Sequence, residues 1–261
     1  MVLSFEGIVV VVSGASKGIG YACAQAFAAA GARVVGISRS QSNLAAARTQ
    51  LQADGQDMAV YAADMTDPAA AAAVVDAIER DVGPIGVLVN SAGAARRNAP
   101  ADLSPDAFRQ AMDAKYFSYM HLLEPVAKRM VARKKGSIVN IIGQGGRSPS
   151  IMHIAGGSAN AALMLATVGY AKAYAPFGVR VNGINPGLTH TTRVDEGLAV
   201  QSRASGRPAE DLLAEQVAGI PMGRIAQPEE IANVAVFLAS DMASYVSGAI
   251  IPMDGCESSV L

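Results

Sequence analysis

The stretch Ile8–Gly20, which reads IVVVVSGASKGIG, decides the fold of this 261-residue chain. A β-branched run is followed by a glycine-rich loop and then by an apolar segment that favours a helix. Gly14 permits a tight turn, Gly18 lets the backbone approach a pyrophosphate, and Gly20 lets the helix pack on the strand. The helix N-terminus offers free N–H groups and a positive dipole end to the phosphates. The pattern therefore predicts a dinucleotide site at the start of a βαβ unit.

Short apolar runs alternate with Ala-rich helical segments along the whole chain. The runs are Ile8–Val12, Arg33–Ile37, Ala59–Ala62, Val87–Asn90, Ser137–Ile142, Arg180–Ile184 and Ala249–Pro252. They are continuously apolar, which is typical of strands buried on both faces of a parallel sheet. The alternation predicts an α/β fold, a single doubly wound Rossmann-type domain over residues 1–261 with helices on both faces of the sheet. Residues 189–225 interrupt the alternation with polar, Gly and Pro residues, and we expect a substrate lid there.

Composition argues against several classes of partner. The 21 Lys and Arg balance 22 Asp and Glu, so we expect no nucleic-acid partner and no membrane-surface patch. Cys23 and Cys256 form neither a CxxC pair nor a disulfide framework, which fits a reducing cytosol. The first apolar run lacks the basic region of a signal peptide, and no stretch approaches the ~18 apolar residues of a membrane span. We expect a cytoplasmic protein with no metal site.

The glycine spacing GxxxGxG resembles that of the short-chain dehydrogenase/reductase family, and further family landmarks follow in order. They are Asn90-Ser91-Ala92-Gly93, Gly178–Asn182, Asn185-Pro186-Gly187, Arg224–Ala232, and Gly248 with Asp254-Gly255. The resemblance covers the entire chain. It implies an oxidoreductase that uses a nicotinamide dinucleotide, with a central parallel sheet of about seven strands.

The resemblance also assigns residues to the cofactor. Asp64 resembles the acid that receives the adenine amino group, and Thr189, Thr191 or both would hold the nicotinamide carboxamide. The expected cofactor contacts are Gly14, Ser16, Lys17, Gly18, Ile19, Gly20, Ser38, Arg39, Asp64, Met65, Asn90, Ala92, Gly93, Pro186, Gly187, Thr189 and Thr191.

The end of the second strand favours one of the two dinucleotides. NAD enzymes tend to place an acid there for the ribose 2′-OH, whereas this strand ends Gly36-Ile37-Ser38-Arg39. Arg39 offers a planar fork for a 2′-phosphate, Ser38 a hydroxyl, and Lys17 a second cation. These basic residues also fit a solvated surface, but with the acid absent the sequence predicts NADP(H) rather than NAD(H).

The family's four catalytic positions hold unusual residues. The family pattern is an Asn, a Ser, a Tyr, and a Lys four residues after the Tyr. Anchors on the fifth and sixth strands place Gly143 at the Ser position, Gly156 at the Tyr and Asn160 at the Lys. Lys115 stands at the Asn position, and no tyrosine in the chain is followed by lysine four residues later. We therefore predict a divergent member that lacks the catalytic tetrad.

Two residues are candidates to move the proton instead. His153 lies three residues before Gly156 and has an ordinary pKa of ~6.5. Lys115 could polarise a carbonyl from the emptied space. Gln144 and Arg147 could bind an acidic or amide substrate. Each of these four also fits an ordinary structural or solvated role.

Three functions remain open from the sequence. The first is an NADP(H)-dependent oxidoreductase that acts on a small carbonyl or alcohol with a non-standard proton-transfer site. The second is a non-redox enzyme, for hydration or elimination, on the same fold. The third is a catalytically silent dinucleotide-binding protein. The lid mixes arginines with acids, so the sequence predicts no substrate charge. By resemblance we expect a dimer or tetramer that pairs helices 104–133 and 158–175.

Overall fold

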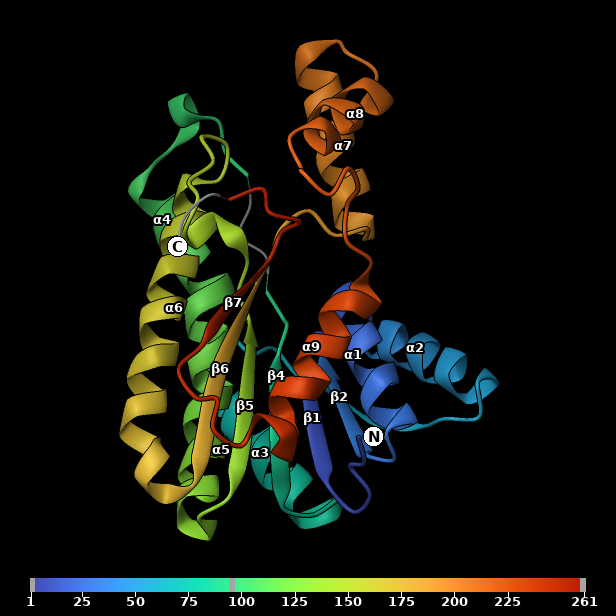
Figure 1. Ribbon diagram of the computed structural model, residues 1–261, viewed down its shortest axis with the longest axis vertical. Coiled ribbons are helices and arrows are strands. Elements are labelled where there is room, and N and C mark those ends of the chain that lie inside the picture. The colour runs from blue at the N-terminus through green and yellow to red at the C-terminus, as the bar shows by residue number, and fades with distance from the viewer. Residues whose placement is uncertain (1–2, 94–96, 259–261) are drawn as a thin grey trace.

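The structure, a computed structural model, describes residues 3–93 and 97–258. Within these residues one sheet of seven parallel strands has the order β3-β2-β1-β4-β5-β6-β7 (Figure 1). The strands are β1 (Val9–Ser13), β2 (Arg33–Ser38), β3 (Met58–Ala62), β4 (Ile85–Asn90), β5 (Gly136–Ile141), β6 (Val179–Pro186) and β7 (Ile250–Met253). Each lies within two residues of a predicted run. The Rossmann-type α/β fold predicted from the sequence is confirmed.

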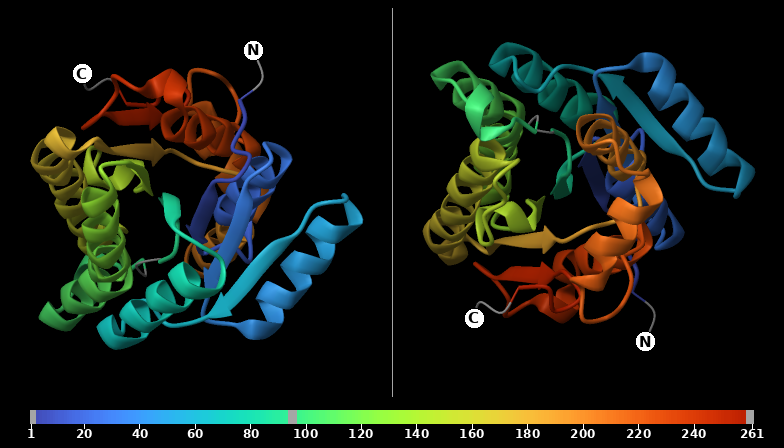
Figure 2. Two further views of the ribbon diagram at one scale, coloured as in Figure 1. Left: turned by 90° about the horizontal axis from the view of Figure 1, so that it is seen from below. Right: turned by 90° about the horizontal axis from the view of Figure 1, so that it is seen from above.

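Helices cover both faces of the sheet (Figure 2). Helices α1 (Gly18–Ala29), α2 (Gln41–Ala53) and α9 (Pro228–Ala239) lie on one face, and α3 (Pro68–Asp81), α5 (Ser118–Arg133) and α6 (Ile154–Tyr174) on the other. Val10 and Val12 of β1 belong to the core of the first face, while Val9 and Val11 belong to that of the second. Side chains alternate across a strand, so burial on both faces requires the continuous apolar run.

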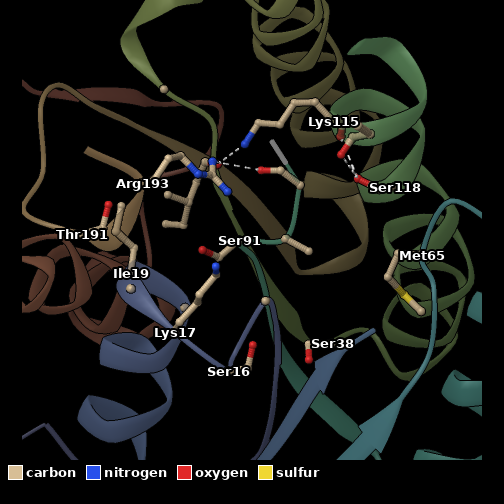
Figure 3. A pocket seen from close by; sticks show the side chains of 18 of the residues that line it. Ser16, Lys17, Ile19, Ser38, Met65, Ser91, Lys115, Ser118, Thr191 and Arg193 are labelled. Carbon is tan, nitrogen blue, oxygen red and sulfur yellow. Dashed lines mark hydrogen bonds between the residues drawn. The ribbon is translucent and has the colours of Figure 1, made fainter. Parts of the chain in front are cut away.

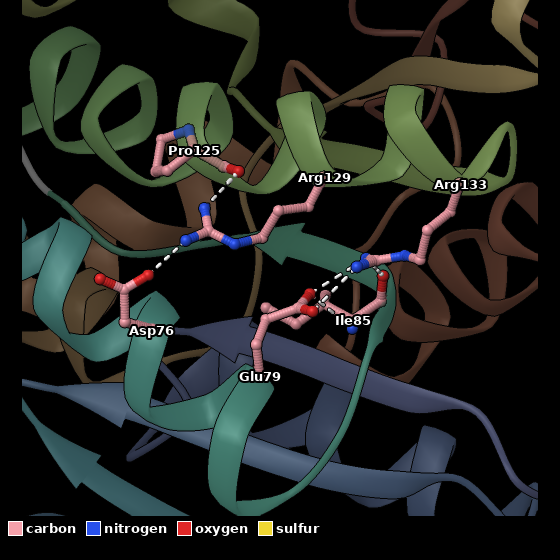
Figure 4. Close-up of polar contacts among 6 residues, drawn as sticks. All are labelled: Asp76, Glu79, Ile85, Pro125, Arg129 and Arg133. Carbon is pink, nitrogen blue, oxygen red and sulfur yellow. Dashed lines mark hydrogen bonds and ion pairs between the residues drawn. The ribbon is translucent and has the colours of Figure 1, made fainter.

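An ion-pair network fixes α5 against α3 and β4 (Figure 4). The Arg133 guanidinium donates to both carboxylate oxygens of Glu79, at 2.8 and 3.0 Å, and to the carbonyl of Ile85 at 2.9 Å. Glu79 also accepts the Ile85 N–H at 2.9 Å. Arg129 binds Asp76 one turn away. The pairs therefore join the C-terminal part of α5 to α3 and to the start of β4.

Two helices differ from the prediction. The long helix expected over 104–133 is divided into α4 (Pro105–Ala111), a π-helical turn (Met112–Phe117) and α5. A π turn inserts an extra residue, and such turns often lie at functional sites. The helix expected from residue 158 begins at Ile154, so Gly156 and Gly157 lie in its first turns. Gly157 is required there, because a Cβ would lie 2.6 Å from the carbonyl oxygen of Gly145.

The excursion at 189–225 is mostly helical. It contains α7 (Thr192–Ser205) and α8 (Ala209–Ala218), which project beyond the carboxyl ends of the strands (Figure 1). A parallel bridge between Thr189 and Ala226 closes its base. Its role as a substrate lid stays a prediction. Among the described residues, no helix has the length and apolar character to cross a membrane, and no group of three or more His, Cys, Asp or Glu is placed to hold a metal.

Candidate functional site

Hydrogen bonds at the start of the glycine loop join the ends of β1 and β4. The hydroxyl of Ser13 accepts the N–H groups of Ser91 and Ala92 at 3.1 and 3.2 Å. Gly14 has a φ of +73°, and a Cβ there would lie 2.9 Å from the backbone of Ala92. From β1 the chain adds β2 and β3 on one side of the sheet, and it then adds β4 to β7 on the other side. Open α/β sheets bind their ligands at the point where this direction changes, which here lies between β1 and β4. The loop therefore shapes a crevice at the expected place.

A cleft of about 1060 Å³ opens over these strand ends. Sixteen of the seventeen predicted cofactor residues line it: Gly14, Ser16, Lys17, Gly18, Ile19, Gly20, Ser38, Arg39, Asp64, Met65, Ala92, Gly93, Pro186, Gly187, Thr189 and Thr191. Figure 3 labels some of them, among them Lys17, Ser38 and Thr191. The structure thus brings together residues that lie up to 177 positions apart in the sequence (14 to 191). Their contacts with the cofactor itself stay a prediction.

Asn90 is the exception, and the structure gives it another role. It is not among the described residues that line the cleft. Its side chain is fully buried and its Nδ2 donates to Asn140 Oδ1 at 3.0 Å, while Asn140 Nδ2 donates to the Thr167 hydroxyl at 2.9 Å. This chain of hydrogen bonds ties β4, β5 and α6 together. Asn90 therefore stabilises the packing of the elements below the cleft and does not line the cleft itself.

The backbone around the glycine loop fits a dinucleotide. Gly18 has a φ of +57°, and a Cβ there would lie 3.2 Å from the Thr191 methyl group. A side chain would thus close the passage between the helix N-terminus and the lid, where phosphates bind in such folds. Lys17 and Arg39 line the same cleft, and neither forms an ion pair within the described residues. Both cations are therefore available to a phosphate.

Lys115 is a buried lysine at the opposite end of this cleft (Figure 3). It lies in the π turn, and its Nζ donates to the Tyr119 hydroxyl at 2.8 Å and to the Ile141 carbonyl at 2.9 Å. The Tyr119 hydroxyl donates to the same carbonyl at 2.6 Å. Burial, and then the positive charge of Arg193, lower the pKa of Lys115 to about 7. Both protonation states are therefore accessible near neutral pH.

Tyr119 is the residue that the sequence reasoning missed. The family pattern has a lysine four residues after a tyrosine, whereas this chain has the reverse order, Lys115 and then Tyr119, at the same spacing of four. Tyr119 is fully buried and does not line the described cleft. Burial raises its pKa well above the ordinary value, so the phenol stays protonated. It accepts a hydrogen bond from the lysine and lies outside the described cleft lining.

His153 lies at the start of α6 but outside the described cleft lining. Its ring packs on Gly145, where a Cβ would lie 3.3 Å from Cδ2, and its buried Nδ1 has no partner among the described residues. Burial lowers the pKa of His153 below its ordinary value. The positive charges of Arg97, Lys115 and Arg193 lower it further. The lowered pKa disfavours the protonated imidazole, and the ring lies outside the described cleft lining.

The other three predicted tetrad positions carry no ionisable group. Gly143 lines the cleft with a φ of +120°, and its carbonyl accepts Asn160 Nδ2 at 3.4 Å. Gly156 and Asn160 are buried in α6. Of the four positions named from the sequence, only Lys115 therefore offers a proton. That these positions correspond to the family's tetrad stays a prediction.

Gln144 and Arg147 follow β5 and are not among the described residues that line the cleft. The Gln144 side-chain oxygen is buried without a partner in the described chain, near Gly187. Their assignment to substrate binding stays a prediction.

Comparison with known proteins agrees with this geometry. A family model described as Enoyl-(Acyl carrier protein) reductase matches residues 14–256. The 3-oxoacyl-[acyl-carrier-protein] reductase FabG of Escherichia coli (strain K12) is 31% identical over 258 residues, 97% of this chain and 98% of that protein. The chain belongs to the short-chain dehydrogenase/reductase family. The family membership predicted from the motifs is thereby confirmed.

Two further members of the short-chain dehydrogenase/reductase family show the range of similar proteins. D-threitol dehydrogenase of Mycolicibacterium smegmatis is 34% identical over 254 residues, 96% of this chain and 92% of that protein. The structure of L-sorbose reductase from Gluconobacter frateurii, complexed with NADPH and L-sorbose, is 28% identical and has a TM-score of 0.93 over 100% of both chains. These relatives are oxidoreductases that differ in substrate.

Proposed function

We propose that this chain is an NADP(H)-dependent oxidoreductase that acts on a small carbonyl or alcohol, with Lys115 as its proton donor and acceptor. The observation that carries the proposal is the position of Lys115. It is buried, it lines the cleft, and two acceptors hold its ammonium. Among the four positions of the expected tetrad it is the only ionisable residue.

NADP(H) is favoured over NAD(H) by the residues at the end of β2. Ser38 and Arg39 line the cleft where NAD enzymes tend to present an acid, and Lys17 adds a second cation. The similar L-sorbose reductase binds NADPH, which supports the same choice. In this proposal Arg39 and Lys17 bind the 2′-phosphate.

The proposed mechanism divides the reaction between cofactor and chain. A bound NADPH would supply a hydride to the carbonyl carbon. The Lys115 ammonium would donate a proton to the carbonyl oxygen, and the resulting amine stays hydrogen-bonded at Tyr119. Solvent in the cleft would return the proton, and the reverse reaction would use the neutral amine as base. A positioned acid of this kind contributes roughly 10²–10⁴ in rate.

Turnover of NADPH with a panel of small aldehydes and ketones tests the proposal. We expect Lys115→Met to lower kcat by about 10² or more while the Kd for NADPH is unchanged. Lys128→Met, on the exposed side of α5, is the control. Tight NADPH binding without turnover would favour the silent binding protein instead. Consumption of substrate without oxidation of NADPH would favour a non-redox enzyme.

A further inference from the structure

The two ends of the cleft differ in how they balance charge. Five basic side chains line it, namely Lys17, Arg39, Arg97, Lys115 and Arg193, and the one acid among the described lining residues is Asp64. Lys17, Arg39 and Asp64 follow β1, β2 and β3 and belong to the nucleotide end. Arg97, Lys115 and Arg193 are left at the lid end. No carboxylate faces them from the described lining.

The basic residues of the described chain fall into two groups: some, such as Arg33, Lys172 and Arg203, form no ion pair, and others do. Eight other basic residues form ion pairs within the described chain: Arg48, Arg80, Arg109, Lys128, Arg129, Arg133, Arg207 and Arg224. None of the five cleft cations is among them. Lys115 donates only to the neutral oxygens of Tyr119 and Ile141, and the Arg193 side chain to the Gly93 carbonyl at 3.5 Å. Lys115 is buried, whereas Arg97 and Arg193 are exposed, so the lid end presents positive charge that is open to an anion from solvent.

The three lid-end cations come from three separate elements. Arg193 is on α7 and Lys115 on the π turn, and Figure 3 shows both side chains at the same end of the cleft. Arg97 follows β4 and reaches the lid helix, because a Cβ on Gly197 would lie 4.0 Å from its Cζ and Nη1. Glu196, one turn along α7 from Arg193, is outside the described cleft lining. The fold therefore brings these three cations together, and they do not form a local run of basic residues in the sequence.

We infer that the substrate carries an anionic group, a carboxylate or a phosphate, which Arg193 and Arg97 bind while its carbonyl faces Lys115. The inference rests on the proposed function. Guanidinium groups bind both anions through paired hydrogen bonds, and a cleft of one sign attracts ligands of the opposite charge. The mixed charges of residues 189–225 conceal this preference in the sequence. Of the arginines in that segment, only Arg193 is among the described lining residues.

Binding to the NADP⁺ complex tests the inference without chemistry, because NADP⁺ cannot reduce a ketone. Isothermal titration would compare levulinate with methyl levulinate, and dihydroxyacetone phosphate with dihydroxyacetone. We expect the anionic member of at least one pair to bind about tenfold more tightly or better. Arg193→Gln should remove most of that preference, and Arg97→Gln should weaken it independently. Arg203→Gln, on the same helix but outside the described lining, is the control.

The outcomes separate the inference from the proposed function. Equal binding of both members of each pair would overturn the inference even if NADPH turnover is found. A loss of NADPH affinity in Arg193→Gln, with the anion preference intact, would also overturn it and assign Arg193 to the cofactor. An anion preference that depends on Arg193, in a protein without turnover, would support the inference for a binding protein. A preference within the levulinate pair would indicate a carboxylate substrate, and a preference within the dihydroxyacetone pair would indicate a phosphate.

Discussion

The Lys115 ammonium and the Tyr119 hydroxyl lie 2.8 Å apart, and both donate to the carbonyl oxygen of Ile141 at the end of β5. Their spacing of four puts them on one helical face. The two residue types are those that the family pattern pairs, but in reverse order and on another helix. Lys115 lines the cleft, whereas Tyr119 is fully buried behind it and accepts a hydrogen bond from the lysine.

The buried lysine should make stability depend on pH. The pKa of Lys115 is lowered to about 7 in the folded protein from an ordinary value near 10.5. Between these values the unfolded chain binds the extra proton, so stability rises with pH. Relative to Lys115→Met, the wild type should gain about 1.4 kcal/mol of unfolding free energy per pH unit from pH 7 to 10, and the difference should be constant below pH 6.

Urea unfolding of both proteins across this pH range measures the difference. The Lys128→Met variant should show no such slope, because Lys128 is exposed on α5 and paired with Glu124. A difference between wild type and Lys115→Met that does not change with pH would mean that Lys115 keeps an ordinary pKa.

The rate of carbonyl reduction should fall as pH rises through about 7, because the donor must be protonated. Tyr119 on α5 contacts Lys115, and the charge of Arg193 on α7 acts on it. His153 is close enough for its pKa to be lowered by the charge of Lys115. Tyr119→Phe removes an acceptor of the ammonium and should move the midpoint of the kcat profile to lower pH by about one unit. Loss of stability with an unmoved midpoint would limit Tyr119 to a structural role.

Cofactor preference should be set by the charge at the end of β2. Arg39→Asp replaces the proposed ligand of the 2′-phosphate by an acid suited to a ribose 2′-OH. We expect the Kd for NADPH to rise by about tenfold to 100-fold, since hydrogen bonds to charged groups contribute about 1.5–3 kcal/mol, and the Kd for NADH to fall. Arg48→Asp, on the exposed part of α2, is the matched control. Unchanged discrimination in Arg39→Asp would argue against a 2′-phosphate at this position.

The sheet and the part of the cleft at the ends of β1, β2 and β3 could be predicted from the sequence because local chemistry determines them. The β1 run must be apolar to be buried on both faces, and close backbone contacts require Gly14 in its loop and Gly20 in α1. Motif residues do not all face the ligand, however. Arg180 donates to the carbonyls of Leu238, Ala239 and Ser240 at the end of α9, and Asn90 is bonded to Asn140. Spacing alone does not separate such supports from cofactor contacts.

The proton-transfer end was less readable because it depends on tertiary placement. Whether His153 or Lys115 faces the cleft follows from the π turn and from the packing of α6, and neither has a local sequence signal. The charge of the lid end was hidden in the same way. Arg193 and Arg97 lie 96 residues apart in sequence (193 minus 97) and line one cleft only through the fold.

A pair of glycine substitutions in helices should separate packing from helix propensity. A Cβ on Gly20, in α1, would overlap the carbonyl oxygen of Gly14, which cannot move without opening the loop. Gly20→Ala should therefore destabilise the protein by about 1–3 kcal/mol and weaken NADPH binding.

Gly169, in the middle of α6, has no heavy atom within 4 Å of its Cβ position in the described chain, apart from its neighbours in the helix backbone. Gly169→Ala should stabilise the protein by up to about 1 kcal/mol through helix propensity alone. Urea unfolding and NADPH titration of both variants measure the contrast, and equal effects at the two sites would contradict the close approach of α1 to the glycine loop.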